Sequence, residues 1–170
     1  MRKLIMITCI LAVFTACDEQ EVRYTQSSAE IDTYKALIAD YESGNWEGYK
    51  SHYAENASVF RNSMDSVSVD ESVNAHRESL MSMSSYGFND EEGDVEMVVT
   101  DKGETWVNFW GTWEGTMKDS DKNFRIPVHI TAKFEDGKIV KSHGYWDNAP
   151  MMMAQMEMEE AKKMADSTDM

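Results

Sequence analysis

The chain has 170 residues, with 16 basic and 31 acidic side chains and a formal net charge of −15. This length fits one domain, and 42% apolar residues with 11% aromatic residues exclude an intrinsically disordered chain. The negative charge argues against binding to a phosphate backbone, and two cysteines are too few for a disulfide scaffold. We therefore expect one globular domain without a nucleic-acid partner.

Residues 1–16 have the pattern of a secretory signal, because Arg2 and Lys3 precede an apolar run that is too short to span a bilayer. The segment VFTAC, which ends at Cys17, resembles a bacterial lipoprotein signal, with Phe14 as a tolerated variant of the preferred leucine. This resemblance implies cleavage before Cys17, lipidation of Cys17 and a membrane partner in the bacterial cell envelope. The outer membrane, with or without surface exposure, is the expected location. A plain secretory signal is the alternative.

The first predicted helices carry recognisable end signals. Ser27 and Glu30 have the spacing of a capping box, and apolar residues then recur at helical spacing as far as Tyr41. Gly44 is expected to end this helix and Asn45 to cap the next one.

A second capping pattern at Ser68 and Glu71 predicts a further helix, which a short strand at NASVF precedes. From residue 94 the hydrophobic period changes to two, and Asp136-Gly137 is the strongest hairpin signal. The predicted strands of this meander are 94–100, 104–117, 124–135 and 138–147. Helices followed by an antiparallel meander predict an α+β fold.

The chain therefore divides into four predicted segments. A signal peptide (1–16) and a flexible acidic tether (17–27) precede the folded domain (28–149). The last segment (150–170) is rich in methionine and is predicted to be an amphipathic helical tail. Its predicted apolar seam consists of Met151, Ala154, Met158, Ala161 and Ala165.

Two long segments, IDTYKALIADYESGNWEGYKSHYAENASVF and FRIPVHITAKFEDGKIVKSHGYWD, resemble the nuclear transport factor 2-like superfamily, particularly its SnoaL-like bacterial branch. The resemblance covers residues 28–147. It implies a cone-shaped half-barrel, in which N-terminal helices pack on a curved antiparallel sheet around an apolar pocket, and it implies frequent homodimers. Members include isomerases, cyclases, dehydratases and binding proteins, so the fold implies no single activity.

Compared with the ketosteroid-isomerase branch, three expected catalytic positions hold residues that cannot do the same chemistry. The positions of the oxyanion tyrosine, the general-base aspartate and the proton-sharing aspartate hold Leu37, Arg61 and Ile130. The resemblance therefore argues against a steroid-isomerase mechanism.

Pairing across the turn at 136–137 predicts which strand residues face the pocket. His143 then lies opposite Ile130, so His143 and Tyr145 are expected on the pocket side. A register slip of one residue would exchange the faces of His143 and His129. The expected pocket residues are Tyr49, Tyr53, Phe60, His76, Phe109, Trp113, Ile130, His143 and Tyr145.

The same registers predict three tryptophans on the outer face of the sheet, which would form a large apolar patch. We expect the helical tail or a second subunit to cover this patch. The expected interface residues are Trp106, Trp110, His129, Trp146, Met151 and Met158.

Three functions remain open at this point. We favour an envelope lipoprotein that binds a small apolar or amphipathic ligand, or a protein partner, without catalysis. The alternative is a SnoaL-like isomerase, cyclase or dehydratase that uses His143 as general acid/base. A weaker alternative is a copper protein, because the thioethers of the tail suit Cu(I). The histidines lack the short spacing of a metal site, and no metal or cofactor is expected.

Overall fold

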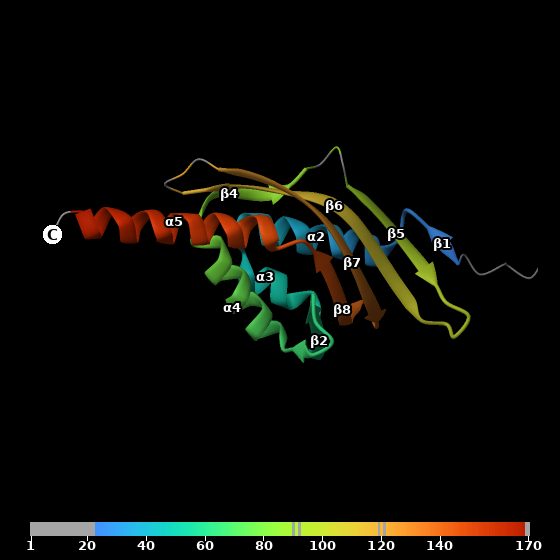
Figure 1. Cartoon of the computed structure of the whole chain (residues 1–170). Coiled ribbons are helices and arrows are strands. Elements are labelled where there is room, and N and C mark those ends of the chain that lie inside the picture. Colours follow the sequence, from blue (N-terminus) through green and yellow to red (C-terminus); the bar gives the residue numbers. More distant parts are fainter. Residues whose placement is uncertain (1–22, 90, 92, 119, 121, 169–170) are drawn as a thin grey trace, which may run out of the picture.

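The computed structural model describes residues 23–89, 91, 93–118, 120 and 122–168, and helices pack on one face of a curved sheet (Figure 1). The helices are α2 (Ala29–Ser43), α3 (Trp46–Ser51), α4 (Val69–Leu80) and the C-terminal α5 (Ala149–Thr168). The strands are β1 (Tyr24–Thr25), β2 (Tyr53–Arg61), β3 (Ser66–Val67), β4 (Met83–Phe88), β5 (Asp94–Val99), β6 (Thr105–Met117), β7 (Asn123–Glu135) and β8 (Lys138–Trp146). The predicted α+β class, with helices on a curved sheet and a helical tail, is confirmed.

The helix ends follow the predicted signals with one shift. Ser28, rather than Ser27, caps α2 and accepts a hydrogen bond from the backbone of the first turn. Gly44 ends α2 with a φ of 69°, a left-handed conformation that glycine adopts without steric cost. Asn45 caps α3, and the predicted capping box at the start of α4 is complete.

Within the described residues the strands form one sheet in the order β1-β5-β6-β7-β8-β2-β3, with β4 also paired to β6. The neighbours are antiparallel except β2 and β8, which are parallel. The predicted meander is confirmed as β5 to β8. β1 pairs with β5 through Tyr24 and Thr25, so the prediction of a flexible tether is wrong at these two residues. β4 has the sequence MSSYGF, whose small residues hide the hydrophobic alternation of a strand.

The hairpin between β7 and β8 contains a bulge. Its turn at 136–137 has positive φ at both residues, as the predicted type of turn requires. Beyond Ile139 the register shifts by one residue, so Lys133 pairs with Lys141 and Val140 has no residue opposite it. Because side chains alternate along a strand, each later residue of β8 faces the side opposite to the predicted one.

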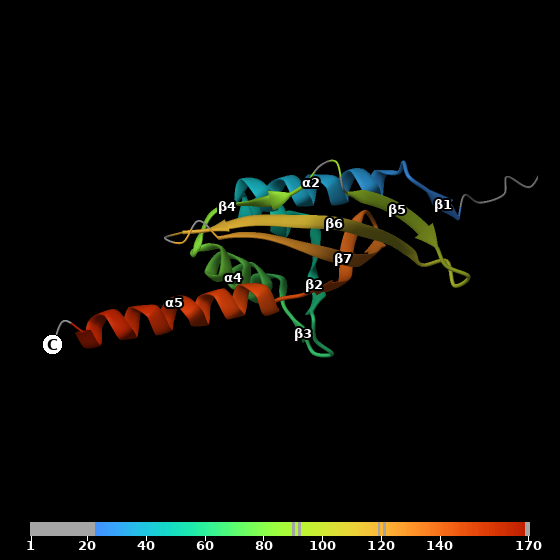
Figure 2. The same ribbon diagram turned by 45° about the horizontal axis from the view of Figure 1, so that its top comes forward.

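The C-terminal helix α5 packs against the inner, helix-covered side of the sheet through its N-terminal half. Ala154 is 1% exposed, and Met151 and Met158 pack against the hydrophobic core. The rest of α5 extends away from the domain (Figure 2). The prediction that the tail covers the outer tryptophans is therefore wrong. The first three residues of its predicted apolar seam, Met151, Ala154 and Met158, are the ones that pack in the hydrophobic core, whereas Ala161 is exposed. None of the helices in the described part of the chain is long and apolar enough to cross a bilayer.

Candidate functional site

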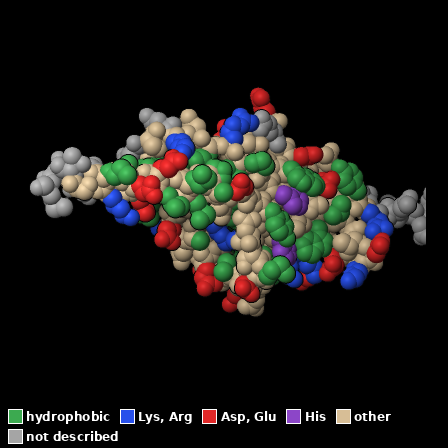
Figure 3. Space-filling model, viewed as in Figure 1, with side chains coloured by type: hydrophobic (Ala, Val, Ile, Leu, Met, Phe, Trp, Pro, Cys, Tyr) green, Lys and Arg blue, Asp and Glu red, His purple; other side chains and the backbone are tan. Residues whose placement is uncertain are grey.

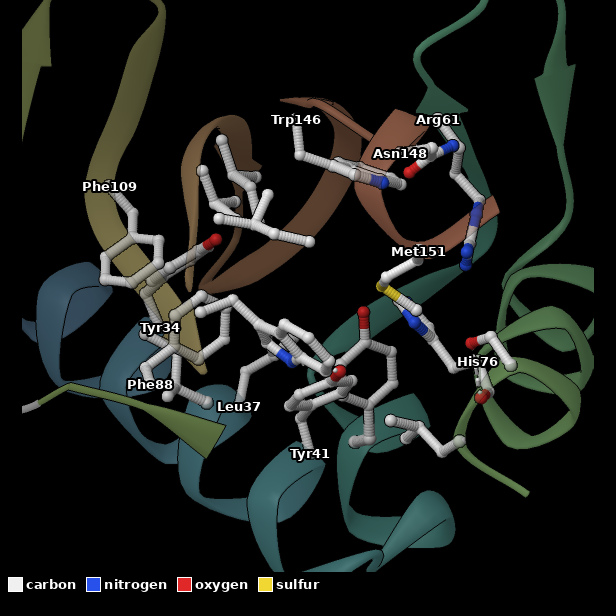
Figure 4. Close-up of a pocket in the computed structure, with 18 of the residues that line it drawn as sticks. Tyr34, Leu37, Tyr41, Arg61, His76, Phe88, Phe109, Trp146, Asn148 and Met151 are labelled. Atoms are coloured by element: carbon white, nitrogen blue, oxygen red, sulfur yellow. Dashed lines mark hydrogen bonds between the residues drawn. The ribbon is translucent and has the colours of Figure 1, made fainter. Parts of the chain in front are cut away.

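A pocket lies between the inner face of the sheet, the helices α2 and α4, and the first turns of α5 (Figure 4). Its cavity volume of about 290 Å³ is near the lower end of the range for small-molecule sites. No Asp or Glu is among the described residues that line it. The lining residues are Tyr34, Leu37, Ile38, Tyr41, Tyr49, Arg61, His76, Ser79, Leu80, Phe88, Phe109, Trp113, Ile126, Val128, Ile130, Trp146, Asn148, Met151, Met152 and Gln155.

The structure brings most of the predicted pocket residues together. Those that line the pocket are Tyr49, His76, Phe109, Trp113 and Ile130. Tyr53 borders a smaller hollow of about 50 Å³, which shares Arg61 and His76 with the pocket. Phe60 also borders this hollow, but its ring stacks on His143, so its predicted place in the pocket is wrong.

The predicted pocket positions of His143 and Tyr145 are wrong. Because of the bulge at Val140, His143 lies on the outer face, where its ring stacks on Phe60 at a centroid distance of 4.3 Å. Tyr145 is 53% exposed on the same face. Neither residue borders the pocket, so His143 is not placed to act as general acid/base on a ligand held there.

The same register shift turns Trp146 into the pocket, although it is predicted on the outer face. Asn62 holds its backbone: the Asn62 amide donates to the Trp146 carbonyl at 2.8 Å and accepts from the Trp146 N–H at 3.0 Å. The indole lies over Gly144, where an added Cβ would come within 2.6 Å of the ring. Trp146 is thus a pocket residue that the sequence prediction missed.

Glycine spacing is the sequence signal that could have found it. The ring of Phe109 lies over Gly111 and the ring of Trp113 lies over Gly115, where an added Cβ would come within 2.4 and 2.3 Å respectively. Residues two apart on a strand share a face, so each glycine lets its neighbouring ring lie flat along the strand. An aromatic residue two positions from a strand glycine therefore indicates a ring on the face of that glycine.

Arg61, at the end of β2, supplies the one permanent charge among the described pocket residues. Its Nη1 donates to the carbonyl of Ser72 at 2.9 Å and to the Ser72 hydroxyl at 3.1 Å. The guanidinium carbon lies 5.6 Å from the ring centroid of Trp146, a cation–π distance. Burial lowers the pKa of Arg61, and within the described residues no carboxylate forms an ion pair with it.

His76 is the histidine that the structure places in the pocket. Its ring packs against Tyr41, Trp46 and Tyr49 at centroid distances of 5.2, 6.3 and 6.0 Å. Burial, and then the charge of Arg61, lower the pKa of His76 to about 3, so the imidazole is neutral at neutral pH. In the described part of the chain its ring nitrogens form no hydrogen bond, so one donor and one acceptor are open to a ligand.

Tyrosine hydroxyls complete the polar groups of the site. The indole N–H of Trp113 donates to the hydroxyl of Tyr41 at 3.0 Å, and the hydroxyls of Tyr49 and Tyr53 lie 3.1 Å apart. Burial raises the pKa of all three tyrosines, so their hydroxyls stay protonated. Because Tyr41 accepts from Trp113, its own proton is free to donate.

The pocket has a polar side and an apolar side. Figure 4 shows Arg61, His76 and Asn148 together on one side of the cavity. Phe109 and Leu37 lie on the opposite side, where the wall consists of hydrocarbon and aromatic rings. This arrangement suits a ligand with an apolar body and one polar end.

The outer face of the sheet carries a row of stacked rings instead of a pocket. Trp110, which is 41% exposed, stacks on His129 at 5.0 Å, and His129 stacks on Tyr145 at 6.3 Å. Trp106 lies on the same face and is partly buried. Figure 3 shows hydrophobic and histidine side chains gathered over β7 and β8.

The predicted interface is therefore divided between two faces. Trp146, Met151 and Met158 lie on the pocket side, and their predicted place in the outer patch is wrong. Trp106, Trp110 and His129 lie on the outer face as expected, and a homodimer through that face stays a prediction.

Two further predictions concern metal and lipid. Among the described residues, no group of three or more His, Cys, Asp or Glu side chains could hold a metal ion. Copper binding by the methionines of α5 stays a prediction. The predicted signal peptide at 1–16 and the lipidated Cys17 lie outside the described residues.

Comparison with known proteins supports the fold. The family model of the SnoaL-like polyketide cyclases matches residues 31–155. The chain is similar to IdmH of Streptomyces antibioticus, a proposed polyketide cyclase, with 16% identity and a TM-score of 0.60 over 75% of this chain and 98% of that one. It is similar to AclR of Streptomyces galilaeus, a proposed hydroxylase, with 12% identity and a TM-score of 0.61 over 75% and 96%.

An NTF2-like protein of unknown function from Burkholderia pseudomallei has 14% identity and a TM-score of 0.59, over 75% of this chain and 97% of that one. At such identities these structures show a shared fold alone. No curated protein sequence matches the chain.

Proposed function

Because the chain belongs to the SnoaL-like polyketide cyclase family, we propose that its pocket binds one small, largely apolar ligand. The observation that carries the proposal is the cavity of about 290 Å³ between the sheet, α2, α4 and α5. A few polar groups converge on one side of an otherwise apolar wall, which is the common form of a small-molecule site.

The titratable groups of the pocket support binding without catalysis. A general base works best when its pKa is near the operating pH. His76 has a pKa of about 3, which makes it a weak base at neutral pH, and His143 lies on the outer face. An isomerase, cyclase or dehydratase of this family remains the second candidate, because IdmH, a proposed polyketide cyclase, shares the fold.

Fluorescence titration with the neutral dye N-phenyl-1-naphthylamine tests the proposal. Ile130→Trp fills the pocket from β7, whereas Thr131→Trp adds the same bulk on the outer face one residue away. We expect saturable binding to the wild-type protein, a loss of about tenfold or more in Ile130→Trp, and little change in Thr131→Trp.

Circular dichroism and thermal unfolding check that both variants are folded. Equal dye affinity in the two variants would place the bound dye outside the pocket and overturn the proposal. Turnover of a carbonyl substrate that depends on His76 would favour the enzyme instead.

We also propose that the protein is carried as a lipoprotein anchored in the bacterial envelope through Cys17. The VFTAC segment after a basic and apolar leader supports this proposal. Mass spectrometry of the N-terminal peptide from the membrane fraction should find acyl chains on Cys17, and Cys17→Ser should release the protein from that fraction. An unmodified N-terminus in the membrane fraction would contradict it.

A further inference from the structure

We infer that the ligand of this pocket is an apolar acid, whose anionic group binds Arg61 while its hydrocarbon body lies against Phe109 and Leu37. The inference rests on the proposed function and names the chemical class of its ligand. It follows from the charge of the pocket, the geometry of Arg61 and the position of His76.

The charge of the pocket is unbalanced in a chain that has an excess of carboxylates. The 31 acidic residues outnumber the 16 basic ones, and elsewhere Lys50 and Lys133 each form ion pairs with two carboxylates. Within the described residues Arg61 has no such partner, and no Asp or Glu lines the pocket. Arg61 is half-buried. A partly desolvated cation without a counter-ion is costly, and an anion from solution would offset that cost.

The geometry of Arg61 prepares it to bind a carboxylate. Ser72 holds Nη1 through two hydrogen bonds, and the indole of Trp146 packs on the guanidinium. In the described part of the chain Nε and Nη2 have no acceptor. These two nitrogens form the planar fork that pairs with the two oxygens of a carboxylate.

The groups beside Arg61 can donate further hydrogen bonds to an anion. His76 is neutral and can donate its ring N–H to a carboxylate oxygen, and Tyr41 retains a free hydroxyl proton. A cationic ligand would meet the charge of Arg61 instead. The opposite wall of the pocket is apolar, so a small hydrophilic anion would leave it without a partner.

Calorimetric titration of a matched pair of probes tests the inference. Naphthalene-1-acetate and naphthalene-1-acetamide share the same rings and nearly the same shape, and differ in charge. We expect the acid to bind about tenfold to a hundredfold tighter than the amide at pH 7.5. Arg61→Met should remove this preference and keep binding of the amide. Arg77→Met, which removes an exposed arginine of α4, should leave the preference unchanged.

The outcomes separate this inference from the proposed function. If the amide binds and the acid binds no tighter, or if the preference survives Arg61→Met, the inference is wrong and the proposed function stands. If neither probe binds the wild-type protein in the pocket, the inference is wrong, and the dye titration decides the proposed function separately.

Should Arg61→Met fail to fold, the wild-type protein supplies a second measurement by NMR. The groups that face the His76 ring are Arg61, Tyr41, Tyr49 and Trp46, of which Arg61 is the charged one. A bound anion there should raise the pKa of His76, whereas the amide should leave it unchanged. No rise with the acid would overturn the inference.

Discussion

On the inner side of the sheet, the ring of His76 is enclosed by Tyr41, Trp46 and Tyr49, whereas on the outer face His143 stacks on Phe60 beside solvent. Burial lowers the pKa of both imidazoles, with help from Arg61 on the inner side and from Lys141 on the outer face. The lowered pKa of His76 is about 3. The surroundings of these two histidines thus differ because helices cover one side of the sheet and leave the other side open.

The largest expected effect is on the pH dependence of stability. The unfolded chain binds a proton at His76 near pH 6.5, and the folded chain does so only near pH 3. Between these values the unfolded state binds more protons, so the stability contributed by His76 falls as the pH falls. The loss is at most about 1.4 kcal/mol for each pH unit. Urea unfolding of the wild-type protein and His76→Phe from pH 7 to pH 4 should show a shallower slope in the variant.

His143→Phe is the matched control on the outer face. Its ring can still stack on Phe60, and its imidazole contacts solvent in the wild-type protein, so the pH slope should change less than in His76→Phe. Equal slopes in the two variants would mean that both histidines experience the same environment. The comparison between the two sides of the sheet would then fail.

A smaller effect is expected from an added methyl group under a pocket ring. Gly144→Ala places a Cβ within 2.6 Å of the Trp146 indole, so the ring or the strand must shift. We expect a loss of about 1–3 kcal/mol in the free energy of unfolding, because overpacking a well-packed interior strains it. Urea unfolding measures this loss.

Gly87→Ala is the control, because no aromatic ring of the pocket lies over this glycine. Its added Cβ would lie 3.4 Å from a carboxylate oxygen of Glu42, which is an ordinary van der Waals contact. We expect a change within about 0.5 kcal/mol. If Gly144→Ala is equally mild, the indole of Trp146 is free to move and does not form a fixed wall of the pocket.

In the hairpin of β7 and β8, the alternation of apolar residues was sufficient to predict which residues of β7 face the pocket. The same alternation was misleading for β8. On β7 the buried residues recur at every second position, so the pocket face is unambiguous. On β8, Ile139 and Val140 are apolar neighbours, and the bulged residue looks like a regular strand residue. The extra residue reverses the faces of His143 and Trp146, which the sequence pattern does not reveal.

The charge of the pocket and the helical tail show a second limit of prediction from the sequence. The family resemblance identified the position of Arg61, but the meaning of that residue depends on the absence of a carboxylate beside it in three dimensions. The spacing of Met151, Ala154 and Met158 predicted which side of the tail is buried. An apolar stripe on a helix does not show which surface the helix packs against. The sequence therefore could not distinguish the outer face of the sheet from the inner face as the place of α5.

The smallest expected effect concerns the end of the pocket that α5 closes. A chain that ends at Asn148 lacks Met151 and Met152, which line the cavity, and Ala154, which is 1% exposed. Naphthalene-1-acetamide should therefore dissociate faster from it, by about tenfold or less, since such changes act mainly on the dissociation rate. The ion pair between Lys122 and Glu157 is also lost, but a surface pair contributes little. Stopped-flow displacement measures the rate.

A chain that ends at Glu159 is the control, because it keeps the buried half of α5 and loses the part that extends away from the domain. It should release the probe at the wild-type rate. Neither truncation should change the oligomeric state measured by sedimentation equilibrium, because α5 lies on the side of the sheet opposite to Trp110. A truncation at Asn148 that changes the oligomeric state and leaves the release rate unchanged would assign α5 to the outer face after all.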